Sequence, residues 1–202
     1  MSGAYMREPF QRQPGQEWNV RQMPVVYLLD AADRFYYVNR TWDWFAAAND
    51  GKHLHTQQVL GKPLWELMTE PDVCAWYGAL LAHVRVGNPV VLNLRCDSPD
   101  WRRLLQLQMF TEDQGFVSCV CGEKEVMRRP YVRLLDRTLP RAGGAVRLCS
   151  WCGRIEVRLG SWREVEDAVA QLAIPSADPL PQLGYTTCPE CVRYVGVLMA
   201  AR

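Results

Sequence analysis

The chain has 202 residues, enough for one or two domains, and it is 49% hydrophobic and 22% charged, as an ordinary globular protein is. Its formal net charge is +1, with a mild basic excess in the last third, so the charge argues against a nucleic-acid-binding surface. No stretch approaches the roughly 18–20 uncharged apolar residues of a membrane span, and the start of the chain lacks the plan of a secretory signal. We therefore expect a cytoplasmic protein whose eight cysteines are reduced, as metal ligands or buried thiols.

Residues 1–21 are mostly polar and are interpreted as an N-terminal arm. After the arm, β-branched and aromatic runs alternate with helical patterns. Strands are predicted at 25–30, 34–39, 89–96, 101–110 and 115–121, and helices at 41–50 and 71–87. Thr41 is the predicted N-cap of the first helix. This order predicts an α+β fold, with an antiparallel sheet and helices on one of its faces.

The stretch "LLDAADRFYYVNRTWDWFA" joins two strands through an Asp-containing turn and opens a helix at an Asn, and "VLGKPLWELM" precedes the long helix. Together with the three closing strands, this order resembles a PAS domain, the small sensor module common in bacterial signalling, over residues 22–125. The resemblance implies a cupped sheet that can hold a small ligand, and a homodimer formed through the N-terminal segment. Trp18, Val20 and Met23 are apolar residues in and beside the polar arm, which suits such packing.

Strand alternation places two sets of mostly apolar side chains on one face of this sheet, the expected concave face. They are Val90, Leu92, Leu94 and Cys96 in one strand and Leu105, Leu107 and Met109 in the next. A filled core and a pocket for a small molecule both remain open, because no polar group among them points to a particular ligand.

Specific cofactors of such a pocket have little support. The three histidines stand in a turn-rich segment or on the long helix, which argues against an axial haem ligand. Cys74 in "PDVCAWYG" does not match the Asn-Cys-Arg motif of the PAS subfamily that forms flavin adducts. Cys119 and Cys121 share one face of a strand, either as two buried thiols or as a redox pair or metal ligands.

Beyond the PAS-like segment the composition shifts, and "RRPYVRLLDRTLPRAGGA" is basic, contains prolines and includes two adjacent glycines. We interpret residues 126–145 as a linker between two units with independent cores. Its apolar side chains are unfavourable in water, so we expect this stretch to dock against the sheet of the first unit. They are Tyr131, Val132, Leu134 and Leu135.

Two Cys-x-x-Cys pairs are the strongest chemical signal in the chain. "LCSWC" carries Cys149 and Cys152, and "TTCPEC" carries Cys188 and Cys191. Two residues between cysteines let both sulfur atoms turn toward one point, so the two pairs can form a tetrahedral four-sulfur site that suits Zn²⁺. A dithiol redox couple, four-thiolate iron and unligated cysteines remain as alternatives.

Residues 146–202 are interpreted as a small zinc-stabilised α/β module, because a short segment with a small hydrophobic core usually needs a bound metal or a similar cross-link to fold stably. "SWREVEDAVAQL" predicts a helix at 161–172 that begins with a capping box of Ser161 and Glu164. Its apolar stripe would cover the metal, while Glu164, Glu166 and Asp167 face water. The pattern around the cysteines resembles a cysteine-rich segment that follows PAS or receiver-type modules in bacterial signalling proteins.

No motif of a catalytic site is found, and a metal held by four cysteines has no open position for a substrate. We therefore predict a non-enzymatic sensory or signalling protein whose output is contact with a protein partner. One alternative is a thiol redox sensor that uses the Cys-x-x-Cys pairs, and another is a nucleic-acid-binding regulator that uses the zinc module and the basic linker.

Overall fold

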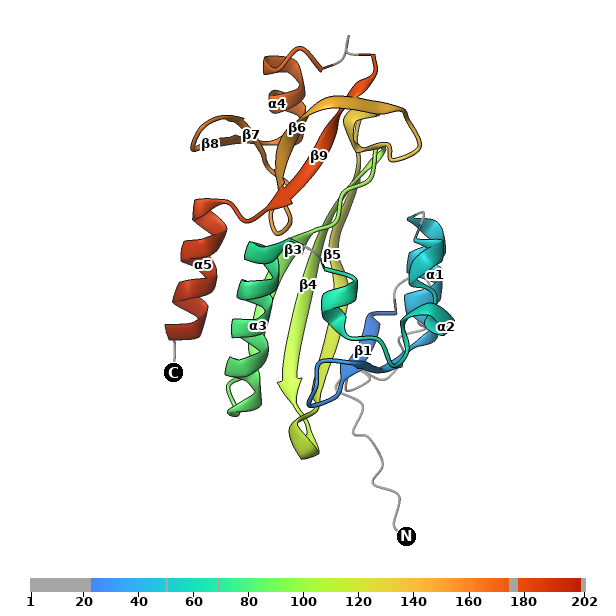
Figure 1. Ribbon diagram of the computed structural model, residues 1–202, viewed down its shortest axis with the longest axis vertical. Helices are drawn as coiled ribbons and strands as arrows, with labels where there is room; N and C mark the ends of the chain where they lie inside the picture. Colours follow the sequence, from blue (N-terminus) through green and yellow to red (C-terminus); the bar gives the residue numbers. More distant parts are fainter. Residues whose placement is uncertain (1–22, 50, 69, 175–177, 201–202) are drawn as a thin grey trace.

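The computed structural model describes residues 23–49, 51–68, 70–174 and 178–200, so the predicted arm at 1–21, with Trp18 and Val20, lies outside the described residues. The first sheet is antiparallel, with strand order β2-β1-β5-β4-β3 (Figure 1). Its strands are β1 (Val25–Leu29), β2 (Phe35–Val38), β3 (Val90–Arg95), β4 (Trp101–Thr111) and β5 (Val117–Arg128). The helices before β3 are α1 (Arg40–Ala48), α2 (Thr56–Val59) and α3 (Pro71–Arg85), with short 3₁₀ turns at Lys52–Leu54 and Leu64–Glu66. Among the described residues, no helix has both the length and the apolar character that crossing a membrane requires.

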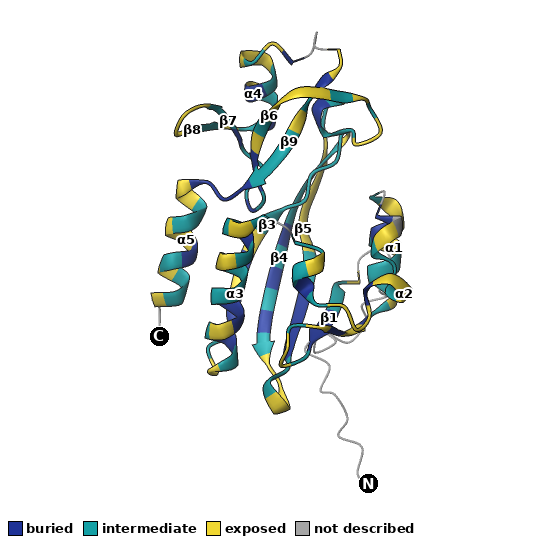
Figure 2. Ribbon diagram, in the orientation of Figure 1, coloured by how far each residue is buried: buried dark blue, intermediate teal, exposed yellow. Residues whose placement is uncertain are grey.

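The core of this unit lies between the sheet and its helices. Leu92 of β3 faces Leu107 of β4 in register, and both pack with Leu80 and Leu81 of α3 in one apolar cluster. Figure 2 shows the buried positions alternating along β4, as a half-covered strand requires. The predicted α+β fold is confirmed, and the arrangement is PAS-like as the resemblance implies. Leu92, Leu107 and Met109 of the predicted inner face are at most 1% exposed, whereas Leu94 and Cys96 are half-buried.

The first helix is capped by Asn39, the Asn that opens the helix in the PAS resemblance, and not by Thr41. Thr41 lies inside α1, and the side chain of Asn39 accepts a hydrogen bond from the N–H of Trp42 at 3.2 Å. The same oxygen accepts from the N–H of Val26 at 3.1 Å, so Asn39 also ties the helix to β1. The prediction of Thr41 as the cap is wrong because an earlier residue offers a cap that is at least as favourable and also contacts the sheet.

The second unit has a sheet of four strands in the order β8-β7-β6-β9, in which β6 and β9 are parallel and the other neighbours antiparallel. Its elements are β6 (Arg141–Cys149), β7 (Ile155–Arg158), β8 (Ser161–Arg163), α4 (Val165–Gln171), β9 (Leu180–Thr186) and α5 (Pro189–Ala200). A second apolar cluster supports this sheet. Its buried members are Val132, Leu134, Leu148, Ile155, Val165, Ala168, Ile174 and Leu180.

The helix predicted at 161–172 begins later than expected. Ser161–Arg163 pairs with β7 as strand β8, and α4 starts only at Val165. Gly160 has a φ of +75°, a conformation that glycine adopts easily and that allows the tight turn between β7 and β8. Ser161 is therefore not a helix cap, and the capping-box prediction is wrong because strand pairing takes up the residues that would have opened the helix.

The segment predicted as a linker is partly structured. Strand β5 continues to Arg128, a 3₁₀ turn spans Arg133–Leu135, and β6 begins at Arg141. The side chains of Val132 and Leu134 are buried in the second apolar cluster. The expected docking against the first unit is seen only in part: the N–H groups of Arg129 and Val132 donate to the carbonyls of Asp100 and Pro99 between β3 and β4, whereas the buried apolar side chains belong to the core of the second unit.

Candidate metal centre

Four cysteine side chains at one end of the second sheet meet at a single point. Cys149 is the last residue of β6 and Cys152 follows in the next turn, while Cys188 stands between β9 and α5 and Cys191 lies in the first turn of α5. Their sulfur atoms all lie within 4.8 Å of one another. The two pairs meet because β6 and β9 are parallel neighbours, with Cys149 in register with Thr186.

Each pair is shaped by a turn whose N–H groups point toward sulfur or close the loop. The N–H of Cys149 donates to the carbonyl of Arg154 at 2.8 Å, and the N–H of Gly153 donates to the carbonyl of Cys149 at 2.9 Å. In the second pair, the N–H of Cys188 donates to the sulfur of Cys149 at 3.3 Å. The N–H of Cys191 donates to the sulfur of Cys188 at 3.4 Å. Such N–H donors favour the thiolate form that metal binding requires.

The spacing of the sulfur atoms fits a tetrahedral ion. A tetrahedron with metal–sulfur bonds of about 2.3 Å has sulfur–sulfur edges of about 3.8 Å. The sulfur atoms of Cys152 and Cys188 are 3.7 Å apart, and all four cysteines are free thiols. Cys149 and Cys188 are fully buried, so solvent is excluded from one side of the cluster. The residues present therefore fit a four-coordinate metal ion.

Contacts among these thiols lower the pKa of one cysteine and raise the pKa values of two others. Hydrogen bonds from Cys152 and Cys191 lower the pKa of the Cys149 thiol, although burial opposes this shift. The hydrogen bond with Cys149 raises the pKa of Cys152, and the same partner raises the pKa of Cys191. One thiolate is thus favoured at the expense of its neighbours. A divalent cation at the centre of the cluster would favour ionisation of the other thiols as well.

The cysteine cluster packs against the first unit. Cys149, Trp151, Cys188 and Val195 belong to the same apolar cluster as the core of the first sheet. Trp151, which stands between the two cysteines of the first pair, is 4% exposed, and its ring centroid lies 6.2 Å from that of Tyr77 in α3. The second unit thus has an apolar cluster of its own, as expected, while its cysteine end packs into the core of the first unit.

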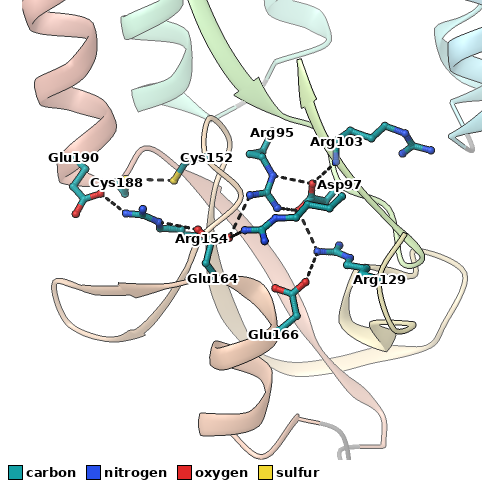
Figure 3. A network of polar contacts seen from close by, with 11 residues as sticks. Arg95, Asp97, Arg103, Arg129, Cys152, Arg154, Glu164, Glu166, Cys188 and Glu190 are labelled. Atoms are coloured by element: carbon teal, nitrogen blue, oxygen red, sulfur yellow. Dashed lines mark hydrogen bonds and ion pairs between the residues drawn. The ribbon is translucent and has the colours of Figure 1, made fainter. Parts of the chain in front are cut away.

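A network of ion pairs lies beside the cysteines and joins the two units (Figure 3). Glu164, which directly precedes α4, pairs with Arg154 at 3.2 Å, with Arg95 at 3.3 Å and with Arg102. Arg95 also pairs with Asp97 at 2.5 Å. The prediction that Glu164 faces water holds only in part: its side chain is 34% exposed, and its carboxylate receives guanidinium groups from both units.

The same network includes a second carboxylate that was expected to be solvated. Glu166 pairs with Arg129 at 3.2 Å, and Arg129 pairs with Asp97 at the same distance. The side chain of Arg129 is only 4% exposed, whereas Asp167 is exposed as expected. The arginines of this network belong to strands or turns of both units and follow no periodic pattern, so the sequence carried no signal for it.

The other cysteines considered in the sequence lie apart from this cluster. Within the described residues, the four-cysteine set is the group that brings three or more potential metal ligands together. Burial raises the pKa of Cys119 and of Cys121 to about 12, so both are neutral thiols; Cys119 is fully buried and Cys121 half-buried. The hydroxyl groups of Tyr27 and Tyr77 are 2.7 Å apart, and Tyr27 also contacts Cys119. This buried tyrosine pair was not found from the sequence, because its members lie fifty positions apart.

Comparison with known proteins finds no matching family model and no matching curated protein. Among solved structures, the chain is similar to a domain of a sensory box sensor histidine kinase/response regulator from Geobacter sulfurreducens, with 15% identity, a TM-score of 0.37, and coverage of 49% of this chain and 82% of that one. The PAS domain of the Cronobacter turicensis RpfR quorum-sensing receptor, in complex with C12:0, matches with 18% identity, a TM-score of 0.36, and coverage of 55% and 99%. The PAS domain of Bordetella pertussis BvgS matches with 16% identity, a TM-score of 0.34, and coverage of 50% and 71%.

Proposed function

We propose that this chain is a non-enzymatic signalling protein in which a PAS-like domain is joined to a structural zinc centre. The observation that carries the proposal is the buried four-sulfur cluster, which packs into the core of the PAS-like unit. A zinc ion held by four protein thiolates has no position left for a substrate or a water molecule, so it stabilises structure rather than performing catalysis.

Zinc is the metal that we assign to Cys149, Cys152, Cys188 and Cys191. Paired Cys-x-x-Cys turns with tetrahedrally placed sulfur atoms are typical of structural zinc, and four-thiolate iron is the rival with the same geometry. All eight cysteines are free, which suits a reducing compartment, so we place the protein in the cytoplasm.

Protein purified without added metal is expected to contain one zinc ion per chain. Elemental analysis measures the metal, and a thiol reagent should label four more cysteines after chelation than before it, because bound thiolates are protected. A coloured protein that contains iron would change the metal assignment. An absence of metal together with four freely reactive thiols would refute the structural centre, and a reversible Cys149–Cys152 disulfide would favour the redox alternative.

We assign the output of the signalling protein to contacts with another protein. The side chains of Leu107 and Met109 on the inner face of the first sheet are packed against their neighbours, which favours protein contact over a small ligand at this part of the face. A partner protein, including a second copy of the chain, is therefore the proposed recipient of the signal.

The homodimer is proposed to form through the N-terminal arm. Met23, the first described residue, is 46% exposed although it is apolar. Deleting residues 1–20 should shift the mass in solution, measured by light scattering, toward that of a monomer. A truncated protein with the same oligomeric state as the full chain would exclude the arm from the interface.

A further inference from the structure

The first cysteine turn is bonded to the edge of the PAS-like sheet. The N–H of Arg95, the last residue of β3, donates to the carbonyl of Trp151 at 2.7 Å. A Cβ added to Gly153 would approach the Cβ of Arg95 to 3.3 Å, so the turn lies directly against the strand. The turn therefore contacts the outer edge of β3, which is the edge strand of the first sheet as the described residues form it.

The second cysteine turn is bonded to the start of α3. One carboxylate oxygen of Asp72 accepts from the hydroxyl of Thr186 at 2.5 Å and from the N–H of Thr187 at 2.9 Å. Thr187 directly precedes the cysteine Cys188. The N-cap residue of α3, Glu70, makes no capping bond with its side chain. The contact through Asp72 therefore joins the first turn of this helix to the residues that lead into the second cysteine turn.

A side-chain contact continues from the first turn into the interior. The ring of Trp151 packs on Tyr77 in the middle of α3, and the hydroxyl of Tyr77 is bonded to that of Tyr27 in β1. Trp151 is buried, and its indole N–H finds no hydrogen-bond partner among the residues that the structure describes, so packing holds the ring in place. A turn that loses its metal loses the constraint that directs Trp151 into the core.

We propose that occupancy of the four-cysteine centre controls the order of β3 and of the first half of α3, so that the PAS-like domain responds to metal binding. The inference rests on the proposed zinc centre. It goes beyond that centre because the two cysteine turns are assigned a regulatory contact with the sensor fold in addition to stabilising their own unit. Release of the metal frees both turns, and with them the edge of the sheet and the start of the helix.

Hydrogen exchange of the full chain, read by mass spectrometry, tests the proposal. Zinc-loaded protein is compared with protein treated with a zinc chelator and a thiol reductant, and zinc is then added back. Amides at 74–78 and 90–95 should exchange about tenfold faster without zinc and recover on reloading, whereas amides of β1 and β2 should change little. Unchanged exchange in α3 and β3 after zinc has left would overturn the inference, and so would an equal loss of protection in all four elements.

One variant tests the link between the second cysteine turn and α3 without removing a zinc ligand. Asp72→Ala should keep its zinc but exchange faster at the start of α3 even when loaded, while β6 and β9 keep their protection. Asp113→Ala is the matched control, because Asp113 is an exposed carboxylate at the turn between β4 and β5. If loaded Asp72→Ala exchanges like the control, the inference fails and the zinc centre stands. If the natural protein binds no zinc at all, both fail.

Discussion

Replacing Cys188 by serine is expected to release the metal and to lower the free energy of unfolding by on the order of 5 kcal/mol. Serine is a poor zinc ligand, and Cys188 is fully buried in the core that both units share. The loss therefore has two parts, since metal binding no longer stabilises the folded state and the end of the second unit is no longer held against α3. Denaturant unfolding and elemental analysis on the same sample measure both parts.

Cys74→Ser is the matched control for this variant. Cys74 lies in α3, where its thiol donates to the carbonyl of Met68 at 3.0 Å, and a serine hydroxyl can make the same bond. Its effect on the free energy of unfolding should stay below about 1 kcal/mol, with the zinc content unchanged. A chelator should destabilise the natural protein and the control but have no further effect on Cys188→Ser. A Cys188→Ser protein that keeps its zinc would show that this cysteine is not a ligand.

Replacing Glu164 by glutamine is expected to lower the free energy of unfolding by about 2–3 kcal/mol. The carboxylate neutralises guanidinium groups from Arg95, Arg102 and Arg154, and the side chain of Arg95 is only 12% exposed. The amide removes the negative charge that the three guanidinium groups share, so that Arg95 and Arg154 keep, among the described residues, only Asp97 and Glu190 as counter-ions. The partial exposure of Glu164 keeps the cost below that of a fully buried pair. Thermal or denaturant unfolding at neutral pH measures the difference.

Glu190→Gln is the internal control, because Glu190 pairs with the same Arg154 but its side chain is 61% exposed. Its cost should stay below about 1 kcal/mol. A cost for Glu164→Gln no larger than that of the control would refute the role of Glu164 as the centre of the network.

The contribution of Glu164 should also depend on pH. Burial tends to raise the pKa of this carboxyl, but the bond with Arg154 and the charges of Arg95 and Arg102 lower it below the ordinary value. A lowered pKa in the folded state stabilises the protein above the unfolded pKa of about 4.3, and this stabilisation is lost as the pH falls through the folded value. The difference between Glu164→Gln and the natural protein should therefore be full at pH 7 and vanish in acid.

The sequence by itself determined the features that depend on local spacing. Two residues between cysteines make a turn that directs two sulfur atoms to one point, so the set of Cys149, Cys152, Cys188 and Cys191 could be named without a structure, and the structure brings these sulfur atoms together. Alternation of apolar side chains likewise located the strands of the first sheet, because the side-chain period of a strand is a property of its own backbone.

Only the tertiary structure decided where these local features meet. Arg95 and Glu164 lie sixty-nine positions apart, and no periodicity links them, so the network at the interface had no sequence signal. Ser161 and Glu164 have the spacing of a capping box, but Ser161 lies in strand β8, because pairing with β7 outweighs the local helix propensity. Trp151 and Asp72 join the cysteine turns to α3 for a similar reason. The two units bury apolar surface against each other, and which side chains they share depends on how the two sheets pack rather than on either segment alone.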